Sequence, residues 1–377
     1  MPDTSIPVTD YAVIGGGVVG LAVAYGLLKA GKTVSIFDEG DQAFRASRGN
    51  FGLIWVQSKG LKQPRYARWT IKSRDAWRHF ASELEAETKI DLMLQQAGGY
   101  DFHFSVESLQ RRVEEYEKLK ATLEGNYPYT VLTYEDLLKE EPHIGPNVKG
   151  AILHHLDGHV NPLKLLQALT TATRNLGARF RVRTKISAVE MSENKYALFE
   201  GCEIVGKAQK IIIAAGLGGA ELGPNLGFLA PIKPEAGQIL VTERMPPILS
   251  RPSATLRQMN EGGIQIGSSS DDVGFDDRED VGTLAIIAKD ALAVLPGLAK
   301  INLVRSWSAL RIMSPDGLPI YQNSATHEGI TLVTCHSGVT LAAAHARYLP
   351  QWLEQSGPDM EELNSLLSVF TEDRFNV

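Results

Sequence analysis

Near its start the chain reads Tyr11-Ala-Val-Ile-Gly15-Gly16-Gly17-Val18-Val19-Gly20. A short apolar run before clustered glycines is typical of a buried strand that ends in a tight turn. The apolar residues after Gly20 recur at helical spacing, and Gly31 is a suitable residue to end that helix. We therefore expect a strand, a glycine-rich turn and a helix in immediate succession.

The glycine spacing matches G-x-G-x-x-G, the pattern of a dinucleotide-binding turn. Gly15 permits the tight turn, Gly17 lets the backbone approach a pyrophosphate, and Gly20 lets the helix pack closely on the strand. The helix start at Val18 and Val19 offers free N–H groups and the positive end of the helix dipole to phosphates. These five residues are candidate cofactor ligands.

A second strand over residues 33–37 leads to Asp38, which lies 18 residues beyond Gly20 and is followed by Glu39. An acidic side chain at this place can hold the ribose hydroxyls of an adenosine. Strand, glycines, helix, second strand and carboxylate fall in register. We therefore predict a dinucleotide-binding unit and not a purely structural glycine-rich turn.

The segment Arg45-Ala-Ser47-Arg48-Gly49-Asn50 follows after a short loop. Its small and cationic groups suit the phosphates of a long cofactor and extend toward a flavin, which favours FAD over a nicotinamide. A solvated polar loop is the alternative interpretation of the same residues.

The composition fits a folded protein of two domains, with 377 residues of which 44% are hydrophobic and 22% charged. A net charge of −6 and the lack of a long Lys/Arg run exclude a basic nucleic-acid binder. Two cysteines, Cys202 and Cys335, exclude a disulfide framework and a four-cysteine zinc or iron–sulfur site on this chain alone.

No apolar run reaches the roughly 18 residues of a membrane helix. The first ten residues lack the basic and apolar regions of a signal peptide, and the low cysteine content is typical of a reducing compartment. We expect a cytoplasmic protein without a transmembrane segment.

Four separated motifs carry a resemblance that extends over nearly the whole chain. They are the glycine fingerprint with Asp38, the segment Ser47-Arg48-Gly49-Asn50, the run Ile211-Ile-Ile-Ala-Ala215-Gly216, and a carboxyl-terminal pair, Trp307-Ser-Ala-Leu-Arg311-Ile-Met-Ser-Pro-Asp316-Gly-Leu-Pro319 and His336-Ser-Gly338-Val-Thr340-Leu341. In this combination the chain resembles the D-amino-acid-oxidase-like family of FAD-dependent amine and amino-acid oxidoreductases, to which glycine oxidase and sarcosine oxidase belong.

Two segments point to one branch of that family. Arg48-Gly-Asn-Phe-Gly-Leu-Ile-Trp-Val-Gln57 and Met313-Ser-Pro-Asp-Gly-Leu-Pro319 look like β subunits of heteromeric bacterial dehydrogenases. These include D-hydroxyproline dehydrogenase and the opine (octopine, nopaline) oxidases, which act on N-substituted or cyclic amino acids. The resemblance implies partner subunits that carry further redox centres.

The resemblance also implies an α/β fold with a Rossmann-like FAD-binding domain and an inserted α+β substrate-binding domain built on a mixed or antiparallel sheet. We expect the discontinuous FAD-binding domain at 1–62, 145–230 and 305–377, and the substrate-binding domain at 63–144 and 231–304. Alternating residues in 237–242 and 263–267 predict strands of the second sheet, and 281–295 predicts a helix.

By resemblance, the FAD site includes the backbone of Ile186 at the adenine, and Ala215 and Gly216 at the end of a strand beside the cofactor. A further strand, tight turn and helix would place a second helix start, Gly338-Val339-Thr340-Leu341, near the flavin pyrimidine. Its dipole and N–H groups would stabilise negative charge on the reduced flavin, with Thr340 as a candidate side-chain donor. An ordinary strand–turn–helix without a ligand is the alternative.

Arg311 and His336 are the candidate catalytic residues. The same two residues, together with Trp55 and Gln57, are the candidate lining of the substrate pocket. Arg311 matches the family's substrate-carboxylate arginine, and a guanidinium holds a carboxylate with two hydrogen bonds; a structural salt bridge is the alternative. His336 would contact the substrate or accept a proton, or else hydrogen bond within its own loop. Trp55 and Gln57 would line the pocket entrance, although ordinary packing also explains Trp55.

No GxSxG, HExxH or Walker A motif occurs, so the chemistry depends on the cofactor. His154 and His155 are adjacent in an expected strand and point to opposite faces, which is a poor arrangement for a metal. No residue matches the family's covalent-flavin cysteine or histidine, and Cys335 fits a buried thiol. We expect noncovalent FAD and no metal.

The leading hypothesis is oxidation of a secondary or cyclic amino acid to an imine by hydride transfer to flavin N5, in the catalytic β subunit of a heteromeric dehydrogenase. Positioning by the carboxylate clamp would supply much of the catalysis. The alternatives are a stand-alone glycine/sarcosine-type oxidase that produces peroxide, and a flavin-bound electron-relay or structural subunit. The carboxyl-terminal loop disfavours a nicotinamide-dependent enzyme.

Overall fold

The strand, helix and second strand expected around the glycine fingerprint are confirmed. In the computed structural model, which describes residues 6–40, 46–192 and 194–375, they are β1 (Val8–Ile14), α1 (Val18–Lys29) and β2 (Val34–Asp38). β1 pairs in parallel with β2, and the chain crosses between them through α1. This is the βαβ unit that a dinucleotide-binding turn requires.

A large mixed sheet is built around that unit, with strand order β16-β17-β11-β1-β2-β8. Its further strands are β8 (Arg179–Val182), β9 (Ala188–Ser192), β10 (Lys195–Glu200), β11 (Glu203–Ile213), β16 (Ile320–Asn323) and β17 (Ile330–Thr334). β1, β2, β8, β11 and β17 are parallel, whereas β9, β10 and β16 add antiparallel pairings. The parallel strands therefore come from three separate segments of the chain.

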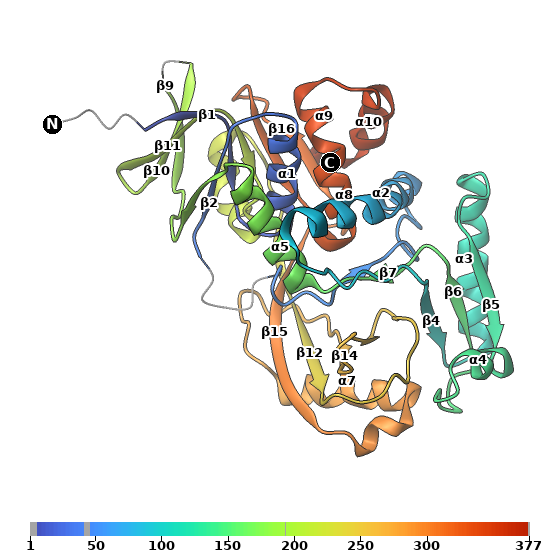
Figure 1. The fold of residues 1–377 in the computed structure, drawn as a ribbon. Coiled ribbons are helices and arrows are strands. Elements are labelled where there is room, and N and C mark those ends of the chain that lie inside the picture. The colour runs from blue at the N-terminus through green and yellow to red at the C-terminus, as the bar shows by residue number, and fades with distance from the viewer. Residues whose placement is uncertain (1–5, 41–45, 193, 376–377) are drawn as a thin grey trace.

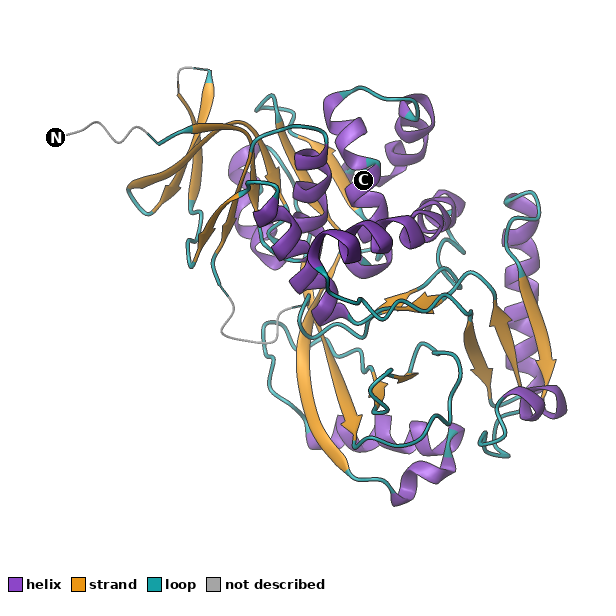
Figure 2. Ribbon diagram, in the orientation of Figure 1, coloured by secondary structure: helices purple, strands orange, loops and turns teal. Residues whose placement is uncertain are grey.

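Helices pack against this sheet (Figure 2). They are α1, α2 (Pro64–Thr88), α5 (Pro162–Asn175), α8 (Gly338–Arg347), α9 (Leu349–Glu354) and α10 (Met360–Leu367). Asn161 caps α5 by accepting hydrogen bonds from the first-turn N–H groups of Leu163 and Lys164, as expected for an Asn-Pro start. One apolar cluster joins these helices to the sheet.

Helix α2 differs from its expected place. The sequence assigned residues 63–144 to the substrate domain, but α2 buries Trp69, Trp77 and Phe80 in the same cluster as α1 and α8. The Ser73 hydroxyl donates to Thr340 O (2.7 Å) and accepts from Ala344 N (3.1 Å) on α8. The domain division remains a proposal, and this packing favours moving α2 to the nucleotide-binding side.

A second sheet lies below the first in Figure 1 and is antiparallel, with order β13-β14-β12-β15. Its strands are β12 (Lys233–Thr242), β13 (Leu256–Gln258), β14 (Ile264–Gly267) and β15 (Leu303–Met313), and α7 (Val281–Val294) covers it. The strands expected at 237–242 and 263–267 and the helix expected at 281–295 are confirmed. The long strand β15 runs from this sheet back toward the nucleotide-binding unit (Figure 1).

The remaining elements form two small sheets and short helices. They are β4 (Gly99–His103), β5 (Tyr129–Thr133) and β6 (Gly150–His154) in one sheet, β3 (Leu53–Ile54) with β7 (Gly158–His159) in the other, and the helices α3 (Val106–Thr122), α4 (Tyr134–Glu140) and α6 (Gly219–Leu222), with 3₁₀ turns at Gly216–Gly218, Pro224–Leu226, Pro296–Lys300, Ser368–Phe370 and Glu372–Phe375. The expected α/β fold class with an antiparallel second sheet is confirmed. Within the described ranges, no helix is both long and apolar enough to span a bilayer.

Helix α1 approaches α8 so closely that only glycine fits at Gly26. A Cβ added there would lie 2.0 Å from Ala346 O and 2.6 Å from Pro350 Cγ. We predict that Gly26→Ala lowers the free energy of unfolding by about 3 kcal/mol, because the helices must separate. Gly297→Ala, where a Cβ meets nothing within 4 Å, is the control in urea unfolding. Equal stability of the two variants would contradict the packing described above.

Candidate functional site

The turn between β1 and α1 is shaped for close approach to a ligand. Gly15 has φ +112°, and a Cβ on it would lie 2.2 Å from Ala214 O. A Cβ on Gly20 would lie 2.0 Å from Gly15 O. No larger side chain fits either position, so the backbone itself forms the cradle that the fingerprint predicts.

Asp38 lies at the end of β2, directly beside this turn. Its Oδ2 accepts from Gly16 N at 2.6 Å, and its Oδ1 accepts from Gly40 N at 2.9 Å. The carboxylate therefore braces the turn, whereas the neighbouring Glu39 is exposed. Contact with a ribose remains a prediction for both.

The segment after the first βαβ unit connects the turn to the second sheet. Arg45 lies outside the described residues, and Arg48 is exposed. Ser47 Oγ accepts from Val18 N (3.0 Å) at the start of α1. Gly49 O accepts from Trp307 Nε1 (3.2 Å) on β15. The segment is therefore held at both ends and is not a free polar loop.

Asn50 and the expected adenine-side residues occupy defined places. Asn50 Oδ1 accepts from Gly52 N (2.7 Å) and keeps the chain turned toward β3. Ile186 is buried in an apolar cluster that also contains Phe37 of β2, and Ala215 packs against that cluster. Gly216, which begins the 3₁₀ turn after β11, has φ +58°. These placements fit the edge of a dinucleotide site, and the individual contacts stay predictions.

The second helix start, at α8, lies against the first. A Cβ on Gly338 would lie 3.1 Å from Val19 Cγ2 at the start of α1. Two helix N-termini therefore meet near the glycine turn, and Leu341 is fully buried behind them. Positive helix ends and a backbone cradle fit the phosphates and the electron-accepting ring of FAD.

The Thr340 hydroxyl was expected to donate a hydrogen bond to the cofactor, but its proton is already used within the protein. Its hydroxyl donates to Leu53 O (3.2 Å) and accepts from Trp55 N (3.1 Å). The side chain therefore ties strand β3 to the first turn of α8. Sequence reasoning missed this because the two partners lie far apart in the chain.

A cavity of about 410 Å³ opens beside this helix start. Its wall includes Trp55, Arg311, His336 and Val339, as well as Lys59, which no sequence motif marks. The structure therefore brings together three of the four expected pocket residues. Gln57, the fourth, does not line the cavity.

Arg311 projects from β15 and is held by protein groups. Its Nη1 forms an ion pair with Glu235 at 2.7 Å, and its Nη2 donates to Ser268 Oγ and Ser269 O. The salt bridge considered as an alternative is thus present. Because a guanidinium has five N–H donors, the contacts that hold Arg311 in the wall leave donors on Nε and Nη1 for a ligand.

His336 lies at the same part of the cavity. Burial, together with the positive charges of Lys59 and Arg311, lowers the pKa of His336 to about 3. The imidazole is therefore neutral near pH 7 and has an acceptor nitrogen available. No hydrogen bond to its ring is present among the described residues, so the alternative of a histidine bonded within its own loop is not what the structure shows.

Gln57 points into a buried polar cluster behind the cavity wall. It receives a hydrogen bond from Tyr116 Oη (3.4 Å), and Asp157 Oδ1 accepts from Val56 N (2.6 Å) and Gln57 N (3.1 Å). His154, 3.7 Å from Asp157, is fully buried. This cluster holds the backbone of the segment that carries Trp55 and Lys59, so the expected pocket role of Gln57 is not supported by its position.

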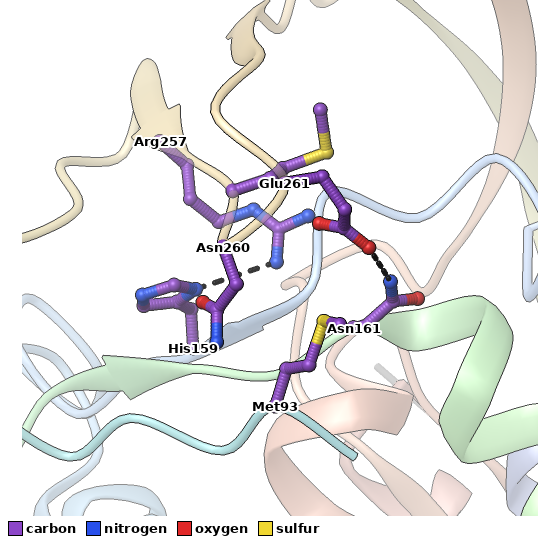
Figure 3. Close-up of a pocket in the computed structure, with 7 residues that line it drawn as sticks. Met93, His159, Asn161, Arg257, Asn260 and Glu261 are labelled. Atoms are coloured by element: carbon purple, nitrogen blue, oxygen red, sulfur yellow. Dashed lines mark hydrogen bonds between the residues drawn. The ribbon is translucent and has the colours of Figure 1, made fainter. Parts of the chain in front are cut away.

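A second hollow of about 10 Å³ lies beside Arg257 (Figure 3). Arg257 is 2% exposed and donates to Val160 O (2.6 Å) and Gln265 Oε1 (2.9 Å from Nε). Its Nη1 also contacts His159 Nδ1 at 3.5 Å. The hollow holds about one water at most, and Arg257 serves to join the second sheet to the β3–β7 pair.

Asp157 gives the polar cluster a measurable pH signature. Burial raises its pKa to about 8, whereas in the unfolded chain the carboxyl loses its proton near pH 4. Unfolding therefore releases a proton between about pH 4 and 8, and raising the pH destabilises the fold. We predict that Asp157→Asn removes roughly 2 kcal/mol or more of this pH dependence in unfolding titrations.

Asp290→Asn, at an exposed carboxylate on α7, is the matched control and should follow the unmodified protein. A stability profile of Asp157→Asn that falls as steeply as that of the unmodified protein would contradict a protonated, buried Asp157.

Comparison with known proteins agrees with this geometry. The family model described as FAD dependent oxidoreductase matches residues 10–352. The opine oxidase B subunit of Rhizobium meliloti is 38% identical over 369 residues, covering 97% of this chain and 98% of that protein, and its counterpart from Agrobacterium tumefaciens (strain Ach5) is 39% identical with the same coverage. The crystal structure of glycine oxidase from Geobacillus kaustophilus superposes with a TM-score of 0.85 at 24% identity, covering 93% of this chain and 95% of that one.

Proposed function

Because the chain belongs to the family of FAD-dependent oxidoreductases and uses FAD as its cofactor, we propose that it oxidises an N-substituted or cyclic amino acid to an imine. The substrate class is an opine, D-hydroxyproline or a similar secondary amine. Full-length similarity to two proteins named as subunits of opine oxidase supports this choice. When bound, FAD supplies a hydride acceptor for the C–H bond next to the amine nitrogen.

The observation that carries the proposal is the meeting of Arg311 and His336 in one cavity beside the start of α8. Arg311, fixed in the wall by Glu235, would bind the substrate carboxylate through its remaining N–H groups. This contact would hold the reacting carbon in place, and positioning of this kind accounts for a large share of catalysis in such reactions.

His336 would receive the proton that the substrate ammonium must lose before oxidation. Its pKa of about 3 reflects burial as well as the positive charges of Lys59 and Arg311. A carboxylate bound at Arg311 offsets part of that positive charge, and so the arriving substrate raises the basicity of the imidazole.

We further propose that the chain acts as a subunit of a heteromeric dehydrogenase. The two similar proteins are both named as one subunit of an opine oxidase, and two cysteines cannot hold an iron–sulfur cluster on this chain alone. A stand-alone glycine-type oxidase that produces peroxide remains the second candidate, favoured by the likeness to the glycine oxidase fold. The cytoplasmic location and the noncovalent attachment of FAD remain predictions.

The test is an anaerobic absorbance titration of the FAD-loaded protein with octopine, nopaline, D-hydroxyproline, proline, sarcosine and glycine. We predict that an N-substituted or cyclic amino acid bleaches the flavin band at lower concentration than glycine does. Slow return of the band on admitting oxygen indicates an acceptor on a partner subunit, and rapid return with peroxide indicates the oxidase. A flavin that no amine bleaches would contradict the proposal.

Arg311→Lys is the variant to include in the same titration. We predict that its half-saturating substrate concentration rises at least tenfold, because an ammonium cannot replace a planar guanidinium at Glu235 and at a carboxylate together. Arg305→Lys, at an exposed position on the same strand, is the matched control. Equal behaviour of the two variants would remove Arg311 from the substrate site.

A further inference from the structure

Lys59 is a cation in the cavity wall that the reaction described above does not use. It follows strand β3 and lines the same cavity as Arg311 and His336. Its Nζ donates to Ser337 Oγ at 2.8 Å and lies 5.8 Å from the centre of the Tyr66 ring. Neither contact supplies a negative charge.

The surroundings of Lys59 leave its charge uncompensated. The acidic groups that act on Lys59 are the Cys335 thiol and the Asp157 carboxyl. Burial raises the pKa of Asp157 to about 8 and that of Cys335 to about 12, so both are largely neutral near pH 7. No ion pair of Lys59 is present among residues 6–40, 46–192 and 194–375. Burial of an ammonium without a counter-ion is costly, which points to an anionic ligand.

The position of Lys59 relative to Arg311 restricts what that anion is. Lys59, Arg311 and His336 line the same cavity, and the positive charges of the two cations contribute to the lowered pKa of His336. Arg311 comes from β15 in the second sheet, whereas Lys59 is held by Ser337 at the start of α8. Two cations from separate elements and one acceptor in the same cavity wall match a ligand that carries two carboxylates and an amine.

We propose that Lys59 binds a second carboxylate of the substrate, so that the cavity selects secondary amines with a carboxylate on each side of the nitrogen. The inference rests on the proposed amine oxidation and names its substrate class more closely. One carboxylate binds Arg311, the other binds Lys59, and the amine proton faces His336. An ammonium has three donors, and its contact with Ser337 uses one of them.

The direct test measures binding without oxidation. The probes are thiodiacetate and (methylthio)acetate, in which sulfur replaces the amine and which differ by one carboxylate. Their dissociation constants are obtained from the absorbance change of the FAD-loaded protein. We predict that thiodiacetate binds about tenfold to a hundredfold more tightly, as expected for a hydrogen bond between charged groups.

Substitution of Lys59 tests whether this residue causes the preference for thiodiacetate. Lys59→Met is expected to bring the two dissociation constants together, whereas Lys59→Arg keeps most of the difference. Lys62→Met, at a lysine three residues on that does not line the cavity, is the matched control and should behave as the unmodified protein. A role of Lys59 in packing or in turnover alone would change both ligands equally and leave their ratio intact.

The pH dependence of this preference provides a second test, because a lysine that only contributes to packing would not make the preference depend on pH. Burial lowers the pKa of Lys59 to about 8, so the ammonium loses its proton as the pH rises through that value. The preference for thiodiacetate should decline above about pH 8 and should decline less in Lys59→Arg, in which the ionisation of Asp157 remains but the loss of the cation does not occur. His336, Asp157, Cys335, Tyr66 and Arg311 are the titratable groups that face this lysine.

The outcomes separate this inference from the proposed reaction. An unmodified protein without preference for thiodiacetate, or a preference that persists in Lys59→Met, overturns the second carboxylate site even if opines bleach the flavin. A preference that depends on Lys59, in a protein whose flavin no amine bleaches, supports the site and overturns the reaction.

Discussion

The first turn of helix α8 holds the wall of the cavity in place through its hydrogen bonds. The Thr340 hydroxyl bonds to both Leu53 and Trp55, and the Ser337 hydroxyl accepts from Lys59 and from Tyr66 Oη (2.9 Å). From the other side, the Thr340 carbonyl accepts from Ser73 Oγ and from Trp77 Nε1 (3.0 Å). One helical turn therefore fixes the cavity wall and binds α2 to the nucleotide-binding unit.

Charge in the cavity is arranged around a neutral histidine. Two cations, Lys59 and Arg311, add to the effect of burial in lowering the pKa of His336, and Arg311 is paired with the carboxylate of Glu235. A ligand that brings negative charge relieves the unfavourable burial of Lys59 and makes His336 a better proton acceptor. Binding and readiness for proton transfer are thus coupled through the same electrostatic field.

The sequence predicts those features that depend on residues close together in the chain. The glycine turn, Asp38 and the helix start at Val18 are set by neighbouring residues, because backbone conformation and close packing there admit few alternatives. The cavity positions of Trp55, Arg311 and His336 were also expected, although only through resemblance to a family.

The features that escaped prediction all depend on contacts between distant segments. Thr340 hydrogen bonds to the segment of β3, and Gln57 accepts a hydrogen bond from Tyr116. Helix α2 packs into the same apolar cluster as α1 and α8. Helical periodicity shows which face of α2 is apolar but not which partner covers it. Lys59 was missed because a lone lysine after a strand has no motif, and its importance appears only when the cavity and its missing counter-ion are seen.

The most direct measurement is a crystal structure of the FAD-loaded protein with a dicarboxylate bound. We predict a flavin ring in the cavity, beside the start of α8, with one carboxylate at Arg311 and the other within hydrogen-bonding distance of Lys59 Nζ. A flavin ring that lies outside the walls formed by Trp55 and His336, or a dicarboxylate that leaves Lys59 without contact, would contradict this account of the site.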